Sequence, residues 1–527
     1  MSDELGLEVD LERGCFRDVH GRRVLLRGAN VGGRAKRAPF LPLELPPVFD
    51  VQDVLAGARE LLSHLPRWGL DTVRLTFSWE GLEPARGAYD EVYFSYLAAV
   101  LDVAFELRLR VVLDFHQDIF ATSLGGDGMP AWTLPPEYRD VMTEDRRNWY
   151  MAYLCDPRVV ESFSRFWRNE DALLDALAAM WIEVIRRFGN HPTVIGYEIM
   201  NEPGWGELDP LLFEKEVWLP LCERIGGMIA RTHPHLILFY GVPGVHALEP
   251  WRHDRFPRLS QVCFAPHLYD PGLLLAPRGG AVSSPERALA KLAALSREAG
   301  LPVFIGEFGC THGAVGAEQW FDEMFSGMDR YGISGTLWEL SQGESRWNFE
   351  DLDLLSPNGS PRPVVRAIAR PRIAALAGEL DEIRWDAPRR QFLVRWYAEG
   401  SASTRIALPG SLGFDALEGL SVFGEDVELA LEALNVLSVS APEHECVEIA
   451  FSWRTVAAGA RHDEPHQITL GQGIQPLGRQ TALIGGSRVE NERAGRAGLA
   501  PEQAGRRELV AVAVAGAPEP NEMSAGI

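Results

Sequence analysis

Short apolar segments recur along the first two thirds of the chain, with stretches of helix length between them. The segments are rich in Val, Ile, Leu and Phe, and polar residues do not alternate with apolar ones. This pattern is typical of parallel strands that are buried on both faces. We expect eight such strands, over residues 24–30, 72–77, 110–117, 194–203, 236–242, 261–269, 303–309 and 335–342.

Amphipathic stretches fill the intervals between the expected strands. Residues 53–68 place apolar side chains at helical spacing, and Gly69 follows them as a helix stop signal. Repeated strand–helix units over about 350 residues predict an α/β fold, the (β/α)8 TIM barrel. A doubly wound open sheet is the alternative, but it usually has fewer strands, and no glycine-rich fingerprint follows the first strand here. The other expected helices cover residues 93–107, 172–188, 214–231, 285–299, 317–331 and 364–376.

The pattern changes at both ends of the chain. Residues 7–24 contain a turn at His20-Gly21 and are expected to form a hairpin that closes the barrel floor. After about Gly378, short strands over residues 382–385, 391–397, 405–408 and 447–451 predict a small β-sandwich. Apolar periodicity vanishes after about residue 457, which predicts a disordered tail. The expected organisation is a barrel with its hairpin over residues 1–377, a C-terminal β-sandwich over 378–456 and the tail over 457–527.

Composition narrows the classes of partner and location. The chain has 51 basic and 74 acidic residues and a formal net charge of −23, so nucleic acid is not an expected partner. No apolar run approaches the ~18 residues of a transmembrane segment, and the first residues lack the order of a secretory signal. The six cysteines form no Cys-x-x-Cys pair, so they predict free thiols in the cytoplasm rather than a zinc site. No cofactor or metal is implied.

Polar side chains stand at the carboxyl ends of six of the eight expected strands, where barrel enzymes place their catalytic groups. Burying such groups beside apolar strands costs free energy unless they are paired or used. The second, third and fourth strands supply the first five of them, and the sixth, seventh and eighth supply the rest: Arg74, His116, Asp118, Asn201 and Glu202, then His267, Tyr269, Glu307 and Trp338.

Glu202 and Glu307 can face each other across the barrel mouth. Glycoside hydrolysis uses such a pair, because one carboxyl protonates the leaving oxygen while the other attacks the anomeric carbon. Asn201 can then hydrogen-bond the sugar 2-hydroxyl, Tyr269 can donate to Glu307 and keep it ionised, and Trp338 offers a flat face for a pyranose ring. Taken singly, Glu307 could be a structural ion-pair partner of Arg74, and the two histidines could be core residues.

The motifs at these strand ends resemble glycoside hydrolase family 5, the cellulase-like family. They occur in family order over about residues 24–342 and are Val-Arg-Leu (73–75), Asp-Phe-His-Gln-Asp (114–118), Met-Asn-Glu-Pro (200–203), Pro-His-Leu-Tyr (266–269), Gly-Glu-Phe-Gly (306–309) and Leu-Trp (337–338). The resemblance implies a retaining β-glycosidase with Glu202 as the acid/base and Glu307 as the nucleophile.

Further motifs resemble the endoglycoceramidase-related branch of that family, which includes glucosylceramidases and sterylglucosidases. The resemblance to this branch implies a C-terminal β-sandwich, glycone binding by Lys36, Asp118 and Trp167, and a β-glucoside or β-galactoside of ceramide or sterol as substrate. Two features depart from it: the chain lacks the signal peptide of secreted endoglycoceramidases, and the residues after 457 match no pattern of the branch. The motifs are Arg-Gly-Ala-Asn-Val-Gly-Gly-Arg-Ala-Lys (27–36), Trp-Glu-Gly-Leu-Glu-Pro (79–84), Gly-Gly-Asp-Gly-Met-Pro-Ala-Trp (125–132) and Ser-Phe-Ser-Arg-Phe-Trp (162–167).

Two other functions stay open on the sequence. An endo-β-1,4-glucanase would act on polysaccharide and needs an open groove with several aromatics that stack on sugars, whereas the apolar Leu273-Leu274-Leu275 after the sixth strand favours a lipid. A non-catalytic barrel that only binds an oligosaccharide has no use for a paired acid and nucleophile. The aromatic residues crowded into residues 120–167 either form a small core of their own or build one wall of an acceptor cleft.

Overall fold

The computed structural model describes residues 5–249, 255–270, 283–311, 314–342, 347–348, 350–410, 414–432 and 435–455. All of them belong to one compact unit that runs from residue 1 to residue 478. The second unit, 479–527, lies outside the described residues, as does the whole segment after 455 for which we expected a disordered tail.

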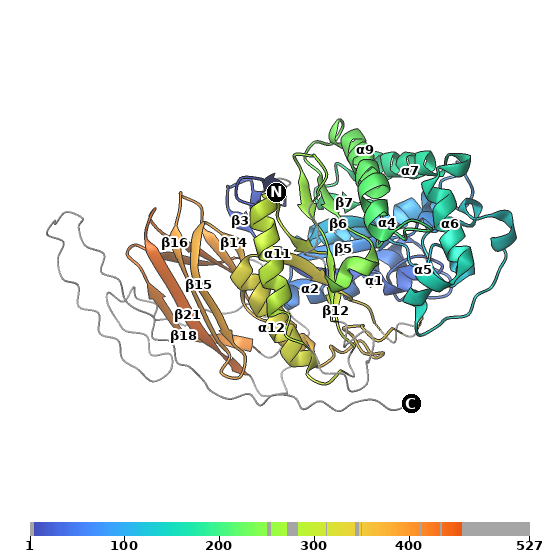
Figure 1. Ribbon diagram of the computed structural model, residues 1–527. Coiled ribbons are helices and arrows are strands. Elements are labelled where there is room, and N and C mark those ends of the chain that lie inside the picture. The colour runs from blue at the N-terminus through green and yellow to red at the C-terminus, as the bar shows by residue number, and fades with distance from the viewer. Residues whose placement is uncertain are drawn as a thin grey trace, which may run out of the picture. The chain divides into compact units, whose positions relative to one another are not determined.

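Eight parallel strands form the central sheet, and they follow one another in the order β11-β13-β4-β5-β6-β7-β8-β9 (Figure 1). Every residue of β4 to β8 is buried, as the apolar runs predicted. The strands are β4 (Arg27–Val31), β5 (Thr72–Phe77), β6 (Arg110–Phe115), β7 (Val194–Glu198), β8 (Ile237–Tyr240), β9 (Val262–Phe264), β11 (Phe304–Ile305) and β13 (Ser334–Leu337).

The two edges of this sheet meet and close the barrel. A parallel bridge joins Phe264 on β9 to Val303, and the Phe264 amide donates to the Pro302 carbonyl at 3.0 Å. Beyond each edge strand the chain continues as a second short strand, β10 (His267–Tyr269) and β12 (Glu307–Gly309), and these two also pair in parallel. The sheet is therefore the (β/α)8 barrel that the sequence predicted, and this closure sets His267 directly opposite Glu307.

Helices occupy the intervals between the strands. The first of them, α1, begins with a capping box in which the Asp50 side chain accepts the Gln52 and Asp53 amides while Asp53 accepts the Asp50 amide. Each helix buries its apolar side against the sheet. The longer ones are α1 (Val51–Leu62), α4 (Glu91–Glu106), α6 (Pro157–Trp167), α7 (Leu173–Phe188), α9 (Leu219–Ala230), α11 (Glu286–Ala299) and α12 (Ala317–Tyr331).

Single helical turns complete the barrel. They are α2 (His64–Arg67), α3 (Trp79–Leu82), α5 (Ala152–Cys155), α8 (Pro210–Phe213) and α13 (Val365–Ile368), together with a π-helical turn over Glu214–Trp218. Within the described residues no helix combines the length and the apolar character needed to cross a membrane.

The helix expected over residues 364–376 is wrong. Only α13 is helical there, and the chain then forms a strand, β14 (Arg372–Leu376). Pro371 lacks a backbone N–H and disfavours the helical conformation of the residue before it, so the helix stops before this proline. The apolar residues after it pair instead with the backbones of β3 (Arg23–Val24) and β17 (Thr404–Ala407).

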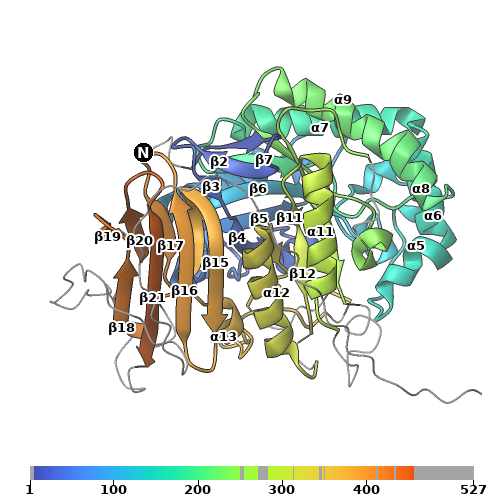
Figure 2. The same ribbon diagram turned by 60° about the vertical axis from the view of Figure 1, so that its left-hand side comes forward.

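Two antiparallel sheets are built from residues outside the barrel. The larger one combines strands that precede the barrel in the sequence with strands that follow it (Figure 2). Its seven strands run in the order β1 (Leu7–Asp10), β2 (Cys15–Asp18), β3 (Arg23–Val24), β14, β17 (Thr404–Ala407), β20 (Val436–Ser440) and β19 (Glu428–Glu432). The smaller sheet has the order β15 (Gly378–Asp386), β16 (Gln391–Ala398), β21 (Cys446–Thr455) and β18 (Phe414–Phe423). The sequence pattern did not predict the strands β14, β18, β19 and β20.

The N-terminal hairpin also touches the barrel. The Phe16 ring on β2 stacks on Phe239 of β8 at 6.2 Å, and both belong to a buried cluster with Phe304 of β11. A separate core, which includes Trp396 and Ile449, fills the space between the two antiparallel sheets. The residues of β14, which we expected to end the last barrel helix, thus form a strand of the larger sheet next to β3.

Candidate active site

A single buried arginine organises the carboxyl ends of the barrel strands. Arg74 lies on β5, is fully buried, and its guanidinium contacts side chains from four other strands or strand ends. Its pKa is raised because the surrounding carboxylates outweigh the effect of burial. The contacts are Nε to Glu198 Oε2 at 2.7 Å, Nη1 to Asn30 Oδ1 and Glu307 Oε1 at 2.9 Å each, Nη2 to Asn201 Oδ1 at 3.0 Å and Nη2 to Asp114 Oδ1 at 3.1 Å.

The carboxylate of Glu307 is held by donors at both oxygens. Arg74 donates to Oε1 at 2.9 Å, and the Tyr269 hydroxyl donates to Oε2 at 2.9 Å. The Nδ1 atom of His267 lies 3.5 Å from the same Oε2. Burial opposes ionisation of this group, but the charges of His267 and Arg74 outweigh burial and hold the pKa of Glu307 below its usual range. Glu307 is therefore ionised at neutral pH, as a nucleophile has to be.

Glu202 faces this carboxylate from the loop after β7. Its backbone has a φ of 35°, and the Gln117 side-chain amide fixes the loop by donating to the carbonyls of Asn201 at 2.7 Å and of Glu202 at 2.9 Å. His267 Nδ1 contacts Glu202 Oε1 at 2.7 Å. One carboxylate oxygen of Glu202, one of Glu307 and a ring nitrogen of His267 lie within 4.8 Å of one another.

The two modes of glycoside hydrolysis differ in the separation of their carboxyl groups, and the nearest oxygens of Glu202 and Glu307 lie within 4.8 Å. Retaining enzymes hold their carboxyl groups about 5 Å apart, whereas inverting enzymes leave roughly 6.5–9.5 Å for a water molecule.

The space between Glu202 and Gly244 is small, since a Cβ atom added at Gly244 would lie 2.4 Å from Glu202 Oε2. Gly244 thus lets the acid pack closely against the loop after β8.

A second cluster surrounds Lys36, which lies in the turn η1 (Gly33–Lys36) after β4. Its Nζ forms an ion pair with Asp118 Oδ2 at 2.7 Å and lies 3.7 Å from Glu350 Oε2. The same Nζ stands over the rings of Trp347 at 3.7 Å and Trp338 at 4.8 Å. Asp118 and Glu350 outweigh burial and raise the pKa of Lys36, so Lys36 stays positively charged beside Asp118.

His116 links this cluster to the strand that carries Trp338. Its ring stacks on the Trp338 ring at 5.0 Å, its Nδ1 contacts Asp114 Oδ2 at 2.8 Å, and its Nε2 lies 3.3 Å from Asp118 Oδ2. Burial lowers the pKa of His116, but Asp114 and Asp118 outweigh burial and raise it to about 10. The structure therefore places an aromatic face beside charged hydrogen-bonding groups, an arrangement suited to a sugar ring.

Trp167 is the one expected site residue that lies away from these two clusters. It ends α6, is 7% exposed, and its indole Nε1 donates to the Gly204 carbonyl at 2.6 Å. Its ring packs against Phe163, Phe166 and Phe213. Trp167 thus supports the loop that carries Glu202 from behind.

Aromatic residues of the segment 120–167 lie in two different places. Phe120, Phe163 and Phe166 are buried together, with Phe120 at 4.9 Å from Phe163 and 6.1 Å from Phe166. Trp149 instead reaches the site, where its ring lies 5.0 Å from that of Trp347 and 5.9 Å from Lys36 Nζ. The three phenylalanines pack together as part of the main buried core, and the interpretation of the segment as a wall of an acceptor cleft stays a prediction.

Several residues of the site were not expected from the sequence. Asp114 and Glu198 lie inside strands β6 and β7, and Asp127 lies beside Asp118. Burial raises the pKa of Glu198 and of Asp127 to about 7 each, so each can carry a proton near neutral pH. The signal for the first two was a lone acid within an otherwise apolar strand, since such a group needs a buried partner.

Comparison with protein families gives one match. The model of the family described as cellulase (glycosyl hydrolase family 5) matches residues 45–344. Among curated proteins, endoglycoceramidase I of Rhodococcus hoagii is 29% identical over 313 residues, which cover 55% of this chain and 60% of that protein. A glucosylceramidase of Aspergillus fumigatus is 30% identical over 250 residues, which cover 38% of this chain and 33% of that protein. The chain thus aligns with about a third to three fifths of the length of these relatives.

Solved structures give the same picture of the fold. Endo-glycoceramidase II from Rhodococcus sp. in its ganglioside GM3 complex superposes with a TM-score of 0.67 at 22% identity, over 83% of this chain and 99% of that one. Cryptococcus neoformans sterylglucosidase 1 superposes with a TM-score of 0.66 at 16% identity, over 85% of this chain and 97% of that one. At such identities the likeness concerns the architecture of the chain.

Proposed function

The chain belongs to glycosyl hydrolase family 5, and from this premise we propose that it is a retaining β-glycosidase that cleaves a β-glucosidic or β-galactosidic bond to a lipid such as a ceramide or a sterol. The observation that carries the proposal is the pair of opposed carboxylates. Glu202 and Glu307 have oxygens within 4.8 Å of each other, and only Glu307 is gripped by an arginine and a tyrosine. The difference in their partners supports different roles.

The first step transfers the sugar to the protein. The ionised Glu307 carboxylate attacks the anomeric carbon, and the bond from that carbon to the lipid oxygen breaks. Glu202 donates its proton to this oxygen, so the lipid leaves as an alcohol and Glu202 becomes a carboxylate. His267 contacts Glu202 at 2.7 Å and lies 3.5 Å from Glu307, so its ring can stabilise the negative charge as it moves from one glutamate to the other.

The second step releases the sugar. A water molecule takes the place of the lipid alcohol, and Glu202 now accepts a proton from it. The water oxygen bonds to the anomeric carbon while the bond to Glu307 breaks. Arg74 and Tyr269 stabilise the carboxylate as it departs, because both donate to its oxygens. Two displacements at one carbon return the original β-configuration.

The groups around Lys36 support a glycone site. Lys36, Asp118 and His116 offer charged donors and acceptors, and Trp338 offers a flat apolar face. The Asn201 amide nitrogen donates one N–H to the Gln117 carbonyl at 3.1 Å, and its second N–H can serve the sugar 2-hydroxyl.

A lipid aglycone rests on the relatives. Proteins named endoglycoceramidase, glucosylceramidase and ergosteryl-beta-glucosidase align with parts of this chain. The Leu273-Leu274-Leu275 segment, which favoured a lipid in the sequence, lies outside the described residues. The six cysteines are free thiols, and this supports the cytoplasm as the proposed location of the activity.

A substrate panel tests the proposal. Purified protein is incubated with aryl β-glucosides, aryl β-galactosides, glucosylceramide, a sterylglucoside and cello-oligosaccharides, and the first-formed anomer is identified by proton NMR. We expect hydrolysis of the glycolipids with β-product formed first. Faster cleavage of cello-oligosaccharides would replace the glycolipid with a polysaccharide, and an α-anomer formed first would refute double displacement.

A further inference from the structure

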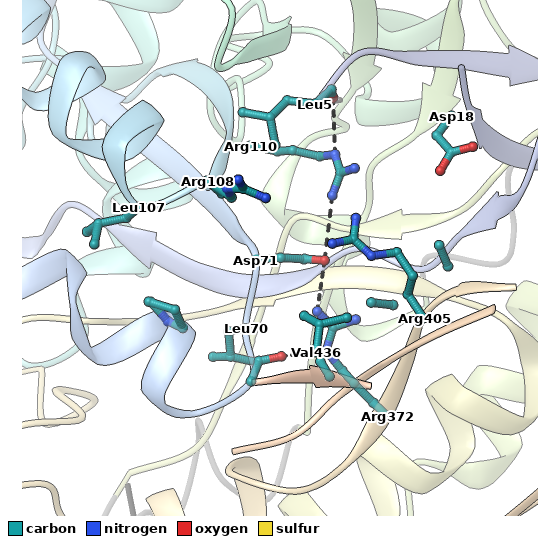
Figure 3. A pocket seen from close by; sticks show the side chains of 15 residues that line it. Leu5, Asp18, Leu70, Asp71, Leu107, Arg108, Arg110, Arg372, Arg405 and Val436 are labelled. Carbon is teal, nitrogen blue, oxygen red and sulfur yellow. Dashed lines mark hydrogen bonds and ion pairs between the residues drawn. The ribbon is translucent and has the colours of Figure 1, made fainter. Parts of the chain in front are cut away.

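A cavity of about 90 Å³ (Figure 3) lies at the amino-terminal ends of the barrel strands, whereas Glu202 and Glu307 lie at their carboxyl ends. Asp71 directly precedes β5 and Arg110 is the first residue of β6, so both lie at the amino-terminal ends of the strands. The remaining wall comes from the larger antiparallel sheet, through Arg372 on β14 and Arg405 on β17. The cavity therefore lies where barrel strands and sheet strands meet.

Four arginines line this cavity, in a chain whose formal net charge is −23. The guanidinium groups of Arg110, Arg372 and Arg405 point toward Asp71 in Figure 3. Asp71 Oδ2 serves two of them, at 2.8 Å from Arg372 Nη2 and 3.6 Å from Arg110 Nη1. The other lining acid, Asp18, is already engaged by Arg22 at 2.7 Å, and Arg405 also pairs with Glu432. Positive charge thus exceeds negative charge around the space.

Some hydrogen-bonding capacity of these arginines is unused. Arg372 is 2% exposed, and its Nη2 has Asp71 Oδ2 at 2.8 Å as its charged partner. Among the described residues the buried Nε of Arg405 has no hydrogen-bond acceptor. Buried N–H groups without acceptors cost free energy, so an acceptor in the cavity would be favourable.

The guanidinium groups also repel one another. Burial lowers the pKa of Arg110, and although Asp71 and Asp18 oppose this effect, the nearby charges of Arg405 and Arg372 lower it further. A water molecule placed between them can accept hydrogen bonds but cannot offset the charge. A bound anion does both.

We propose that this cavity binds a small oxyanion of the phosphate or sulfate class. Such an anion carries acceptors in several directions, and guanidinium groups match it with paired N–H donors. The space of about 90 Å³ is large enough for a compact tetrahedral anion. Bound there, the anion joins Arg110 of the barrel to Arg372 and Arg405 of the larger sheet, and it stabilises the junction without any part in the chemistry at the glutamates.

Thermal unfolding in inorganic phosphate tests the site. The melting temperature is measured in sodium phosphate and in sodium chloride of equal ionic strength, for the native protein, for Arg405→Gln and for Arg384→Gln. Arg384 lies on β15, its side chain is 65% exposed and it is absent from the cavity wall, so it is the matched control. At a phosphate concentration about tenfold above Kd we expect the melting temperature of the native protein and of the control to rise by roughly 2 °C, and that of Arg405→Gln to stay unchanged.

An equal rise in all three proteins would refute the site, because it would mean a general effect of the salt on stability. No rise in any of them would refute it as well. Should Arg405→Gln fail to fold, phosphorus NMR on the native protein decides: phosphate lines that broaden with added protein, and sharpen when sulfate competes, support the site, and unbroadened lines overturn it. Glycerol 3-phosphate is titrated alongside, and tighter binding of this ester would support the site and identify a phosphorylated metabolite as its source. Hydrolysis of an aryl β-glucoside by Arg405→Gln should stay within about twofold of native, since the cavity and the glutamates lie at opposite ends of the barrel.

Discussion

Replacing Tyr269 with Phe should shift the pH at which the enzyme gains activity. The Tyr269 hydroxyl donates to Glu307 Oε2 at 2.9 Å, and it is one of two strong donors to that carboxylate. A hydrogen bond to a charged group contributes about 1.5–3 kcal/mol. One pKa unit corresponds to about 1.4 kcal/mol, so losing this bond raises the pKa of Glu307 by roughly 1–2 units. Arg74 and His267 remain in place, and this favours the lower end of the range.

The sign follows from the role of the group. Glu307 must be ionised to attack, and its pKa is held below its usual range in the native protein. Tyr269→Phe weakens the ionised form, so the acid limb of kcat/KM moves to higher pH. The release of the sugar should also slow by about tenfold, because the departing carboxylate has lost a donor worth at least ~1.4 kcal/mol.

The assay is the pH profile of kcat/KM on an aryl β-glucoside, with Tyr138→Phe as the matched control. Tyr138 also donates to a carboxylate, Glu161 at 2.6 Å, but this pair is exposed. The control should keep the native profile. An acid limb that stays in place in Tyr269→Phe, with normal thermal stability, would show that Tyr269 does not hold the charge of Glu307.

Four further predictions follow from the same structure. Glu307→Gln should lose activity on every substrate, whereas Glu202→Ala should still accept a dinitrophenyl glycoside and form a β-glycosyl azide when azide is added; more than a few per cent of residual activity in Glu307→Gln would contradict its role. Gly244→Ala should reduce cleavage of poor leaving groups far more than that of dinitrophenyl glycosides, because the new Cβ would lie 2.4 Å from Glu202 Oε2, and steady-state rates on the two substrates measure this. Truncation after residue 457 should leave the melting temperature unchanged, whereas truncation after 377 should give insoluble protein by uncovering Leu25 and Ile373, as a solubility assay will show. Replacing Leu273, Leu274 and Leu275 with Ser should raise KM tenfold or more for glucosylceramide but leave an aryl glycoside unaffected; equal losses on both would make the triplet a folding element.

The barrel and the two glutamates could be predicted because each leaves a local mark in the sequence. A fully buried strand such as β8, Ile-Leu-Phe-Tyr, is a continuous apolar run, and Glu202, the proposed acid, follows shortly after another buried strand, β7. The same reasoning found Arg74 on β5 and Tyr269 on β10. These residues need only the strand order to come together, and the barrel supplies that order.

Other features depend on partners that are remote in the sequence. β14 resembles a helix in its apolar spacing, but it pairs as a strand with β3, some 350 residues earlier, and with β17. Trp167 belongs to a motif of the family branch, but its supporting role follows from its hydrogen bond to the Gly204 carbonyl on another loop. Glu350 lies near Lys36 but is in neither a helix nor a strand. The spacing of apolar residues therefore could not predict its place in the site.

The larger antiparallel sheet gives the chain a circular construction. Its first three strands precede the barrel in the sequence, and they pair through β3 with β14 and then with β17 and β20, which follow the barrel. Contacts between such distant residues form late, because the chain loses the entropy of closing a long loop before these contacts can stabilise the fold. During synthesis the N-terminal hairpin is therefore made before the strands with which it pairs. The barrel can form before this sheet is complete. The final pairing ties the two ends of the catalytic unit together, so the barrel that carries Glu202 and Glu307 is locked by the segment made after it.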